Sequence, residues 1–148
     1  MTSQMNLDEL KDFAQGVFDS QPFSTFLDAR LVDATPTSAK IAVRNRIDLQ
    51  QQHGYVHGGV ISYLADNSLT FAGGLALGGD ALTAEYKINY AKPATGEEIV
   101  AEAETISTSR TQAVCRCNVY SCSEGERTLV AVALGTIVAA RRRKNSED

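Results

Sequence analysis

Residues 57–76 read HGGVISYLADNSLTFAGGLA, and the spacing of their apolar positions predicts a long helix over 58–76. Apolar side chains occupy nearly every side of this helix, at Val60, Ile61, Leu64, Ala65, Leu69, Ala72 and Leu75. A helix without a polar face belongs in the interior of a protein, because its apolar surface must leave water. Glycines at 78 and 79 mark its end. We therefore expect a fold built around one buried helix.

After Asp80 the apolar residues follow a two-residue period, which predicts strands. Four strands are expected, over 82–91, 98–108, 112–122 and 129–140. Their connections at 92–96, 109–111 and 123–126 contain the Pro, Gly and small polar residues of hairpin turns. Long strands joined by short hairpins predict an antiparallel meander that packs against the helix.

The segment before the central helix has a simpler pattern. Apolar residues at helical spacing predict an amphipathic helix over 7–20. Two strands, at 31–32 and 41–43, flank a turn at 34–37. The polar stretch that follows, over 44–55, is expected to be a loop.

These elements predict an α+β fold, a long central helix wrapped by an antiparallel sheet, which resembles the hotdog arrangement. One domain is expected over 1–148, with a helical segment at 1–25 and a polar tail at 141–148. A single helix covering one sheet leaves the edge strands open, and pairing two copies edge to edge would cover them. We therefore expect a homo-oligomer, either a dimer or a dimer of dimers.

Composition narrows the possible partners. A net charge of -4 argues against a general affinity for nucleic acid, and no apolar run approaches the length of a membrane span. The first ten residues lack the apolar block of a signal peptide, so a cytoplasmic location with reduced thiols is expected. The three cysteines, Cys115, Cys117 and Cys122, have strand-like spacing, and no metal or other cofactor is expected.

Asp66 is the residue of the central helix that points to chemistry. An ionised carboxylate in an apolar helix costs several kcal/mol unless it is paired, so it is either held by structural partners or kept for function. Gly58 and Gly59 at the helix start leave backbone N–H groups open to a ligand, and the helix dipole favours negative charge there. A carboxylate combined with such a helix start suits acyl transfer.

The triplet His57-Gly58-Gly59, with an acid nine residues after the histidine, resembles the acyl-CoA thioesterases of the PaaI-like branch of the hotdog superfamily. The 4-hydroxybenzoyl-CoA thioesterase type belongs to the same branch. The resemblance covers about 31–140 and includes Gly54 and the stretch INYAKPATGE at 88–97. It implies the hotdog fold and hydrolysis of an acyl-CoA thioester to free acid and CoA.

The resemblance also implies roles for individual residues. Asp66 matches the nucleophile or general base, and Gly58 matches the residue whose N–H polarises the thioester carbonyl. Gln51 stands where relatives carry Asn as a second donor to that carbonyl, and it is one methylene longer. Thr83 stands where relatives have a hydroxyl that orients water, and Arg110 where they place a basic residue near CoA.

Three further residues near the helix start or the acid complete the expected substrate-binding set: His57, Gly59 and Asn67. His57 has the chemistry of a general base but is expected mainly to shape the helix start. The basic run at 141–144 is either a solvated tail or a contact for CoA phosphates.

Spacing along the helix constrains how these residues could work together. Gly58 and Asp66 are eight residues apart, which corresponds to about 12 Å of helix rise. One thioester carbon cannot lie within about 3 Å of both groups. If both act on one substrate, they must come from different subunits, as the family resemblance also implies.

Two other functions remain open. A hotdog hydratase or dehydratase would need a histidine and an acid placed for proton transfer at the α and β carbons of an enoyl-CoA. A non-catalytic acyl-CoA-binding regulator would need a DNA-binding region, and residues 1–25 hold only one predicted helix. The identity of the acyl group does not follow from the sequence.

Overall fold

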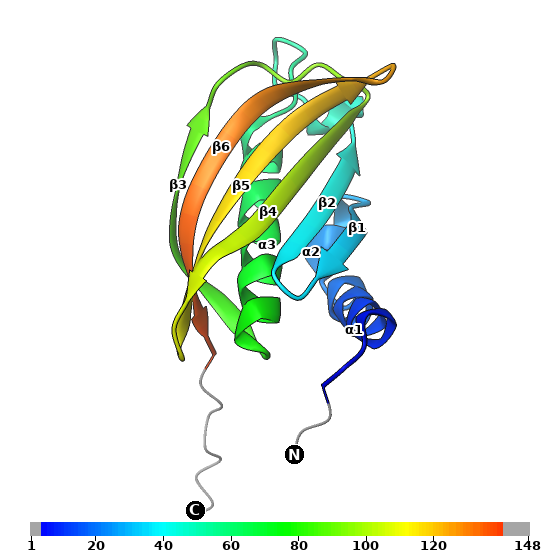
Figure 1. Ribbon diagram of the computed structural model, residues 1–148. Coiled ribbons are helices and arrows are strands. Elements are labelled where there is room, and N and C mark those ends of the chain that lie inside the picture. Colours follow the sequence, from blue (N-terminus) through cyan, green and yellow to red (C-terminus); the bar gives the residue numbers. More distant parts are fainter. Residues whose placement is uncertain (1–3, 141–148) are drawn as a thin grey trace, which may run out of the picture.

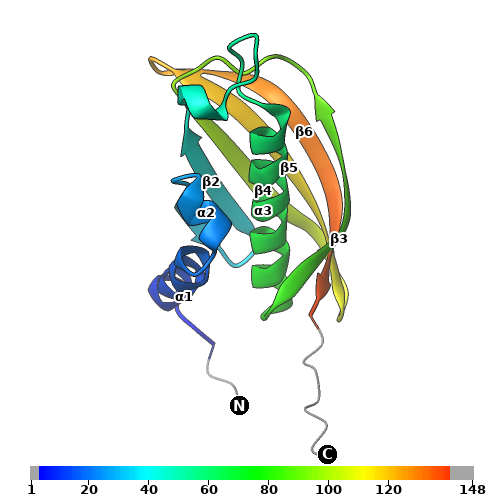
Figure 2. The same cartoon turned by 180° about the vertical axis from the view of Figure 1, so that it is seen from behind.

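The computed structural model describes residues 4–140 and has an antiparallel sheet curved around one long helix (Figures 1 and 2). The helices are α1 (Leu7–Asp19), α2 (Pro22–Phe26), the short 3-10 helix η1 (Ile47–Leu49) and α3 (Gly58–Leu77). The strands are β1 (Arg30–Thr35), β2 (Ser38–Arg44), β3 (Ala81–Tyr90), β4 (Glu98–Thr108), β5 (Gln112–Ser123) and β6 (Glu126–Ala139). This architecture confirms the predicted α+β class with its long central helix. The tail predicted at 141–148 lies outside the described residues.

The six strands lie in the order β1-β2-β4-β5-β6-β3, and each neighbouring pair is antiparallel. Strands β4, β5 and β6 form the predicted meander. The strand predicted over 82–91 is present as β3, but its predicted place in the meander is wrong. It does not pair with β4, the next strand along the chain. It lies at the far edge of the sheet and pairs with β6, from Ala81 opposite Ala139 to Tyr90 opposite Ala131.

The connection between β3 and β4 is therefore a crossing at the end of the sheet, not the hairpin expected at 92–96. Bonds to distant segments hold it there: Val56 N–H donates to the Ala94 carbonyl at 3.0 Å, and Gly96 N–H donates to Ser121 Oγ at 2.7 Å. A Cβ at Gly96 would lie 2.6 Å from the Cys122 carbonyl oxygen, so glycine is required by close approach. Residues that suit a hairpin turn also suit this crossing.

Helix α3 packs against one face of the sheet, with β4 and β5 crossing behind it (Figure 2). Its buried residues include the predicted apolar set from Val60 to Ala72. One side differs from the prediction: Ser62, Asp66 and Thr70 lie one turn apart and are only half-buried. The sheet covers the apolar side of the helix, and α1 and α2 pack on a further side through Phe71 and Tyr63, so the side left over carries the polar groups.

Small residues let α3 approach the sheet closely. A Cβ added at Gly73 would lie 2.6 Å from the Cβ of Ile137 on β6, far inside contact distance. The inner face of the sheet opposite the helix is likewise built largely from small buried side chains, at Ala101, Ala103, Ala113, Cys115, Cys117, Ala131 and Ala133. Helix and sheet therefore meet at a short separation.

The N-terminal helix confirms the sequence prediction and ends at Asp19. Asn6 and Glu9 form a reciprocal capping box at its start, and Leu10, Ala14 and Phe18 are buried. The short helix α2 that follows was not predicted. Five residues are too few for helical periodicity to be visible, although Pro22 at its first position is a typical start signal.

The start of the last strand is set by the turn that precedes it. Strand β6 begins earlier than the predicted residue 129, because Glu124 and Gly125 both have positive φ, as a two-residue hairpin turn requires.

Cys115 and Cys117 are buried, and burial raises the pKa of the Cys117 thiol to about 12. No helix within residues 4–140 is both long and apolar enough to cross a membrane.

We predict that Gly73→Ala lowers the free energy of unfolding by about 1–3 kcal/mol, because its methyl group would overlap Ile137. Gly16→Ala is the matched control, since nothing lies within 4 Å of a Cβ there. In the exposed interior of α1 this change should raise stability by up to about 1 kcal/mol. Chemical denaturation of both variants measures the effect, and equal stabilities would refute the close approach.

Candidate active site

A seam of polar side chains runs between α3 and the edge strand β3. Three side chains and one backbone carbonyl of the helix face hydroxyl groups of the strand. The hydrogen-bonded pairs are Gly58 with Tyr90, Ser62 with Tyr86, Asp66 with Thr83, and Thr70 with Thr83. The helix contributes every fourth residue to this seam, which is the spacing of one helical face.

Asp66 is the single carboxylate of the seam, and its side chain is half-buried. Thr83 Oγ1 donates to Asp66 Oδ1 at 2.6 Å. Within residues 4–140, the second carboxylate oxygen accepts no hydrogen bond from the protein. The carboxylate is therefore fixed by one oxygen, and the other is available to a water molecule or a substrate.

The protons of the two threonines can be assigned from their contacts. Thr83 has one hydroxyl proton, which it donates in the 2.6 Å hydrogen bond to the Asp66 carboxylate. Thr70 Oγ1 lies 2.9 Å from the Asp66 carbonyl oxygen and 2.7 Å from Thr83 Oγ1, so its proton is shared between these acceptors. Both hydroxyls thereby hold the carboxylate in one orientation.

The start of α3 presents one open N–H group. His57 caps the helix, because its Nδ1 accepts the Gly59 N–H at 2.8 Å. The Gly58 N–H finds no acceptor within residues 4–140, and the Gly58 carbonyl accepts the Tyr90 hydroxyl at 3.1 Å. Gly58 is thus the residue of the triplet whose N–H donor is free, and its role in binding an anion stays a prediction.

Gln51 lies with Gly58 at this end of the helix. Both line a hollow of about 360 Å³ whose other walls include Tyr90 and Pro93. Gln51 Oε1 accepts the backbone N–H of His53 at 2.5 Å, which leaves its amide NH₂ as a donor. The structure therefore brings Gln51 and Gly58 together, and it brings Thr83 and Asp66 together, but the two pairs lie about 12 Å apart along α3.

Within residues 4–140, the side chains of Asn67 and Arg110 make no hydrogen bond to either pair. The Asn67 amide exchanges two hydrogen bonds with Gln21, at 3.2 and 2.9 Å, and lies 3.2 Å from the Tyr63 hydroxyl. Burial raises the pKa of the Tyr63 hydroxyl, so this hydroxyl keeps its proton within the network. Arg110 is exposed in the β4–β5 hairpin and contacts neither Asp66 nor Gly58.

Sequence reasoning missed the strand side of the seam. Tyr86 and Tyr90, together with Ser62 and Thr70, were not among the predicted site residues. The signal was present in the helix, where Ser62, Asp66 and Thr70 recur every four residues. It was not visible for the tyrosines, because nothing in the sequence showed that β3 borders this face of α3.

Comparisons with known proteins identify the family. The family profile described as thioesterase superfamily matches residues 53–128. The chain belongs to the thioesterase superfamily. Membership confirms the hotdog fold and supports a hydrolase that acts on thioesters. The match covers the helix start, Asp66 and Thr83.

Three individual proteins are similar to this chain over most of its length. A Deinococcus radiodurans protein named as a candidate esterase is 33% identical over 129 residues, which is 86% of this chain and 84% of that protein. A thioesterase family protein from Silicibacter pomeroyi superposes with a TM-score of 0.80 at 29% identity, covering 84% and 93% of the two chains. A single-residue variant of the phenylacetic acid degradation protein PaaI from Thermus thermophilus gives a TM-score of 0.71 at 30% identity, covering 81% and 100%.

The cap at the helix start gives a stability prediction. His57→Ala removes the acceptor of the Gly59 N–H and should lower the free energy of unfolding by about 1 kcal/mol. His57→Asn should recover most of this loss, because Asn is a favoured cap with an acceptor at similar reach. Thermal and chemical denaturation compare the three proteins. Equal losses for Ala and Asn would mean that the imidazole stabilises the fold in another way.

Proposed function

We propose that this protein hydrolyses an acyl-CoA thioester to free acid and CoA, with Asp66 as nucleophile or general base. The observation that carries the proposal is the Asp66 carboxylate, fixed through one oxygen by Thr83 and open at the other. The free Gly58 N–H at the positive end of the α3 dipole supplies the matching donor for the thioester oxygen. Superfamily membership supports the thioester as the bond that is cleaved.

The two groups act from different subunits in this proposal. Strand β3 is an edge strand with a free side, and the polar seam lies directly behind it. Ser62, which contacts Tyr86, is the midpoint between Gly58 and Asp66. A two-fold axis near Ser62 and Tyr86 would align β3 with its copy and bring Gly58 against Asp66 of the partner subunit. Each dimer then has two equivalent sites.

The reaction follows from this arrangement. Gly58 N–H binds the thioester oxygen and stabilises the negative charge that forms when the carbonyl carbon is attacked. In the general-base route, the free oxygen of Asp66 takes a proton from water, the hydroxide adds to the carbon, and the C–S bond breaks. The CoA thiolate then receives the proton from Asp66. In the nucleophilic route Asp66 itself adds to the carbon, the C–S bond breaks, and CoA leaves as the thiolate. Water then cleaves the resulting anhydride to the free acid and protonated Asp66, which gives its proton to the thiolate.

The other predicted residues have supporting roles in this proposal. Gln51 donates its free amide N–H to the thioester oxygen beside Gly58, since both line the same hollow. His57 and Gly59 shape the helix start, because their groups are bonded to each other. Asn67 anchors Gln21 and the following helix α2 against α3, beside the carboxylate. Arg110 offers a long, flexible cation for CoA phosphates from the β4–β5 hairpin.

Asp66→Asn tests the carboxylate at nearly constant volume. We expect kcat to fall by about 10²-fold or more while substrate binding changes little, because the amide cannot act as base or nucleophile. Asp12→Asn is the matched control, an exposed carboxylate on α1 whose loss should leave kcat unchanged. Thiol release from a panel of aryl and fatty acyl-CoAs measures both. Hydration of an enoyl-CoA without any thiol release would instead indicate the hydratase.

Mixing two inactive variants tests whether the site is shared between subunits. Asp66→Ala removes the acid, and Gly58→Val places a branched side chain beside Tyr90 where the thioester oxygen must approach. Random pairing makes about half of the refolded dimers mixed, and each mixed dimer has one intact site, so roughly a quarter of wild-type activity should return. A tagged pull-down verifies that mixed dimers formed. Verified mixed dimers without activity would place each site within one chain.

A further inference from the structure

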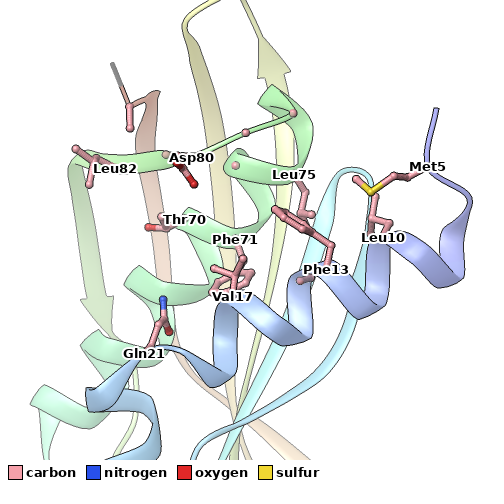
Figure 3. A pocket seen from close by; sticks show the side chains of 16 residues that line it. Met5, Leu10, Phe13, Val17, Gln21, Thr70, Phe71, Leu75, Asp80 and Leu82 are labelled. Atoms are coloured by element: carbon pink, nitrogen blue, oxygen red, sulfur yellow. The ribbon is translucent and has the colours of Figure 1, made fainter. Parts of the chain in front are cut away.

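An apolar groove lies between α1 and the C-terminal half of α3, beside the start of β3 (Figure 3). Its volume is about 600 Å³, within the range of small-molecule pockets. Phe13 and Val17 form the α1 wall, Phe71 and Leu75 form the α3 wall, and Leu82 closes it from β3.

The α1 wall is not explained by the fold. Helix α1 already packs on the protein through Leu10, Ala14 and Phe18. Phe13 and Val17 form a second apolar stripe, one turn apart, and remain 52% and 39% exposed. Leu82 across the groove is 62% exposed. Exposed apolar residues gathered around one hollow indicate a binding surface for an apolar ligand.

The groove continues into the candidate active site. Thr70 lines the groove and lies 2.7 Å, between oxygen atoms, from Thr83, which donates to Asp66 at 2.6 Å. The groove therefore begins one helical turn from the carboxylate. From Thr70 it extends along α3 to Gly78, about 12 Å of helix rise, which is long enough for an extended octanoyl or decanoyl chain.

We propose that this groove holds the acyl chain of the substrate, and that the substrate is a medium-chain fatty acyl-CoA. The proposal rests on the proposed function, because it places the reacting carbonyl beside Asp66 and the chain beyond Thr70. The side chains that form both long walls are apolar and offer a buried hydroxyl no partner, which favours a saturated chain over a hydroxylated ring. Gln21, a polar residue of the wall, is already bonded to Asn67 and Ser24. Asp80, the one carboxylate among the lining residues, lies at the exposed far end.

The first test narrows the groove. Val17→Trp fills the space along the α1 wall, and Asp12→Trp adds the same side chain at an exposed position of α1 that does not line the groove. We expect wild type to prefer decanoyl-CoA to butyryl-CoA in kcat/KM. Val17→Trp should lower that decanoyl-to-butyryl ratio by about tenfold or more, because steric exclusion grows with chain length. Asp12→Trp should keep the wild-type ratio.

The second test reports binding without turnover. The chain contains no tryptophan, so one introduced indole is the only such fluorophore. Phe13→Trp in an Asp66→Asn background places it in the groove wall with little change of shape. Decanoyl-CoA should shift its emission to the blue as the chain displaces water, and CoA alone should not. The indole of Asp12→Trp in the same background should not respond to either ligand.

The outcomes distinguish a failure of the groove assignment from a failure of the proposed function. Absence of thiol release from every acyl-CoA would overturn the proposed function, while the indole shift would still decide whether the groove binds the chain. Hydrolysis with an unchanged decanoyl-to-butyryl ratio in Val17→Trp, or an indole that ignores saturating decanoyl-CoA, would overturn the groove assignment. A third outcome would indicate an interface between copies of the chain. In that case Val17→Trp changes the oligomeric state in size-exclusion chromatography, and the indole of Phe13→Trp already emits at shorter wavelength before ligand is added. Both results together would overturn the groove assignment.

Discussion

A single sheet can pack closely on the apolar helix α3 because much of the inner face of that sheet is made of small side chains. Alanines and cysteines on β4, β5 and β6 leave room for the helix, and Gly73 removes the last side chain from the contact with Ile137. Close packing at native density then allows the sheet to curve around the helix. Larger side chains on either surface would force the two apart and expose apolar area on both.

The polar seam is a consequence of this packing. Once the sheet covers the apolar sides of α3, the remaining side faces the edge strand, where backbone groups and solvent are within reach. A carboxylate can be kept there at lower cost than in the interior, because Thr83 and water share its charge. The helix thus has an apolar side that packs in the core and a polar side that carries the candidate site residues. Its exposed start adds an N–H donor fixed by the cap at His57.

How far the sequence predicts this protein depends on which interactions are local. The central helix and Asp66 follow from one continuous pattern, and Gly58 and His57 follow from the chemistry of helix starts. The place of β3 does not follow, because Pro93 and Gly96 serve a hairpin and a crossing equally well. Tyr86 and Tyr90 were missed for the same reason. Their role depends on a pairing between β3 and β6 that no local signal records.

That distant pairing also sets the order in which the molecule assembles. Strands β4, β5 and β6 are joined by short hairpins and can form from local contacts, whereas β3 must close a loop around the whole meander before it reaches β6. Within one chain, we expect β3 to dock on β6 only after the meander has formed. Thr83 lies on this strand, so the geometry around Asp66 is completed last as the chain folds.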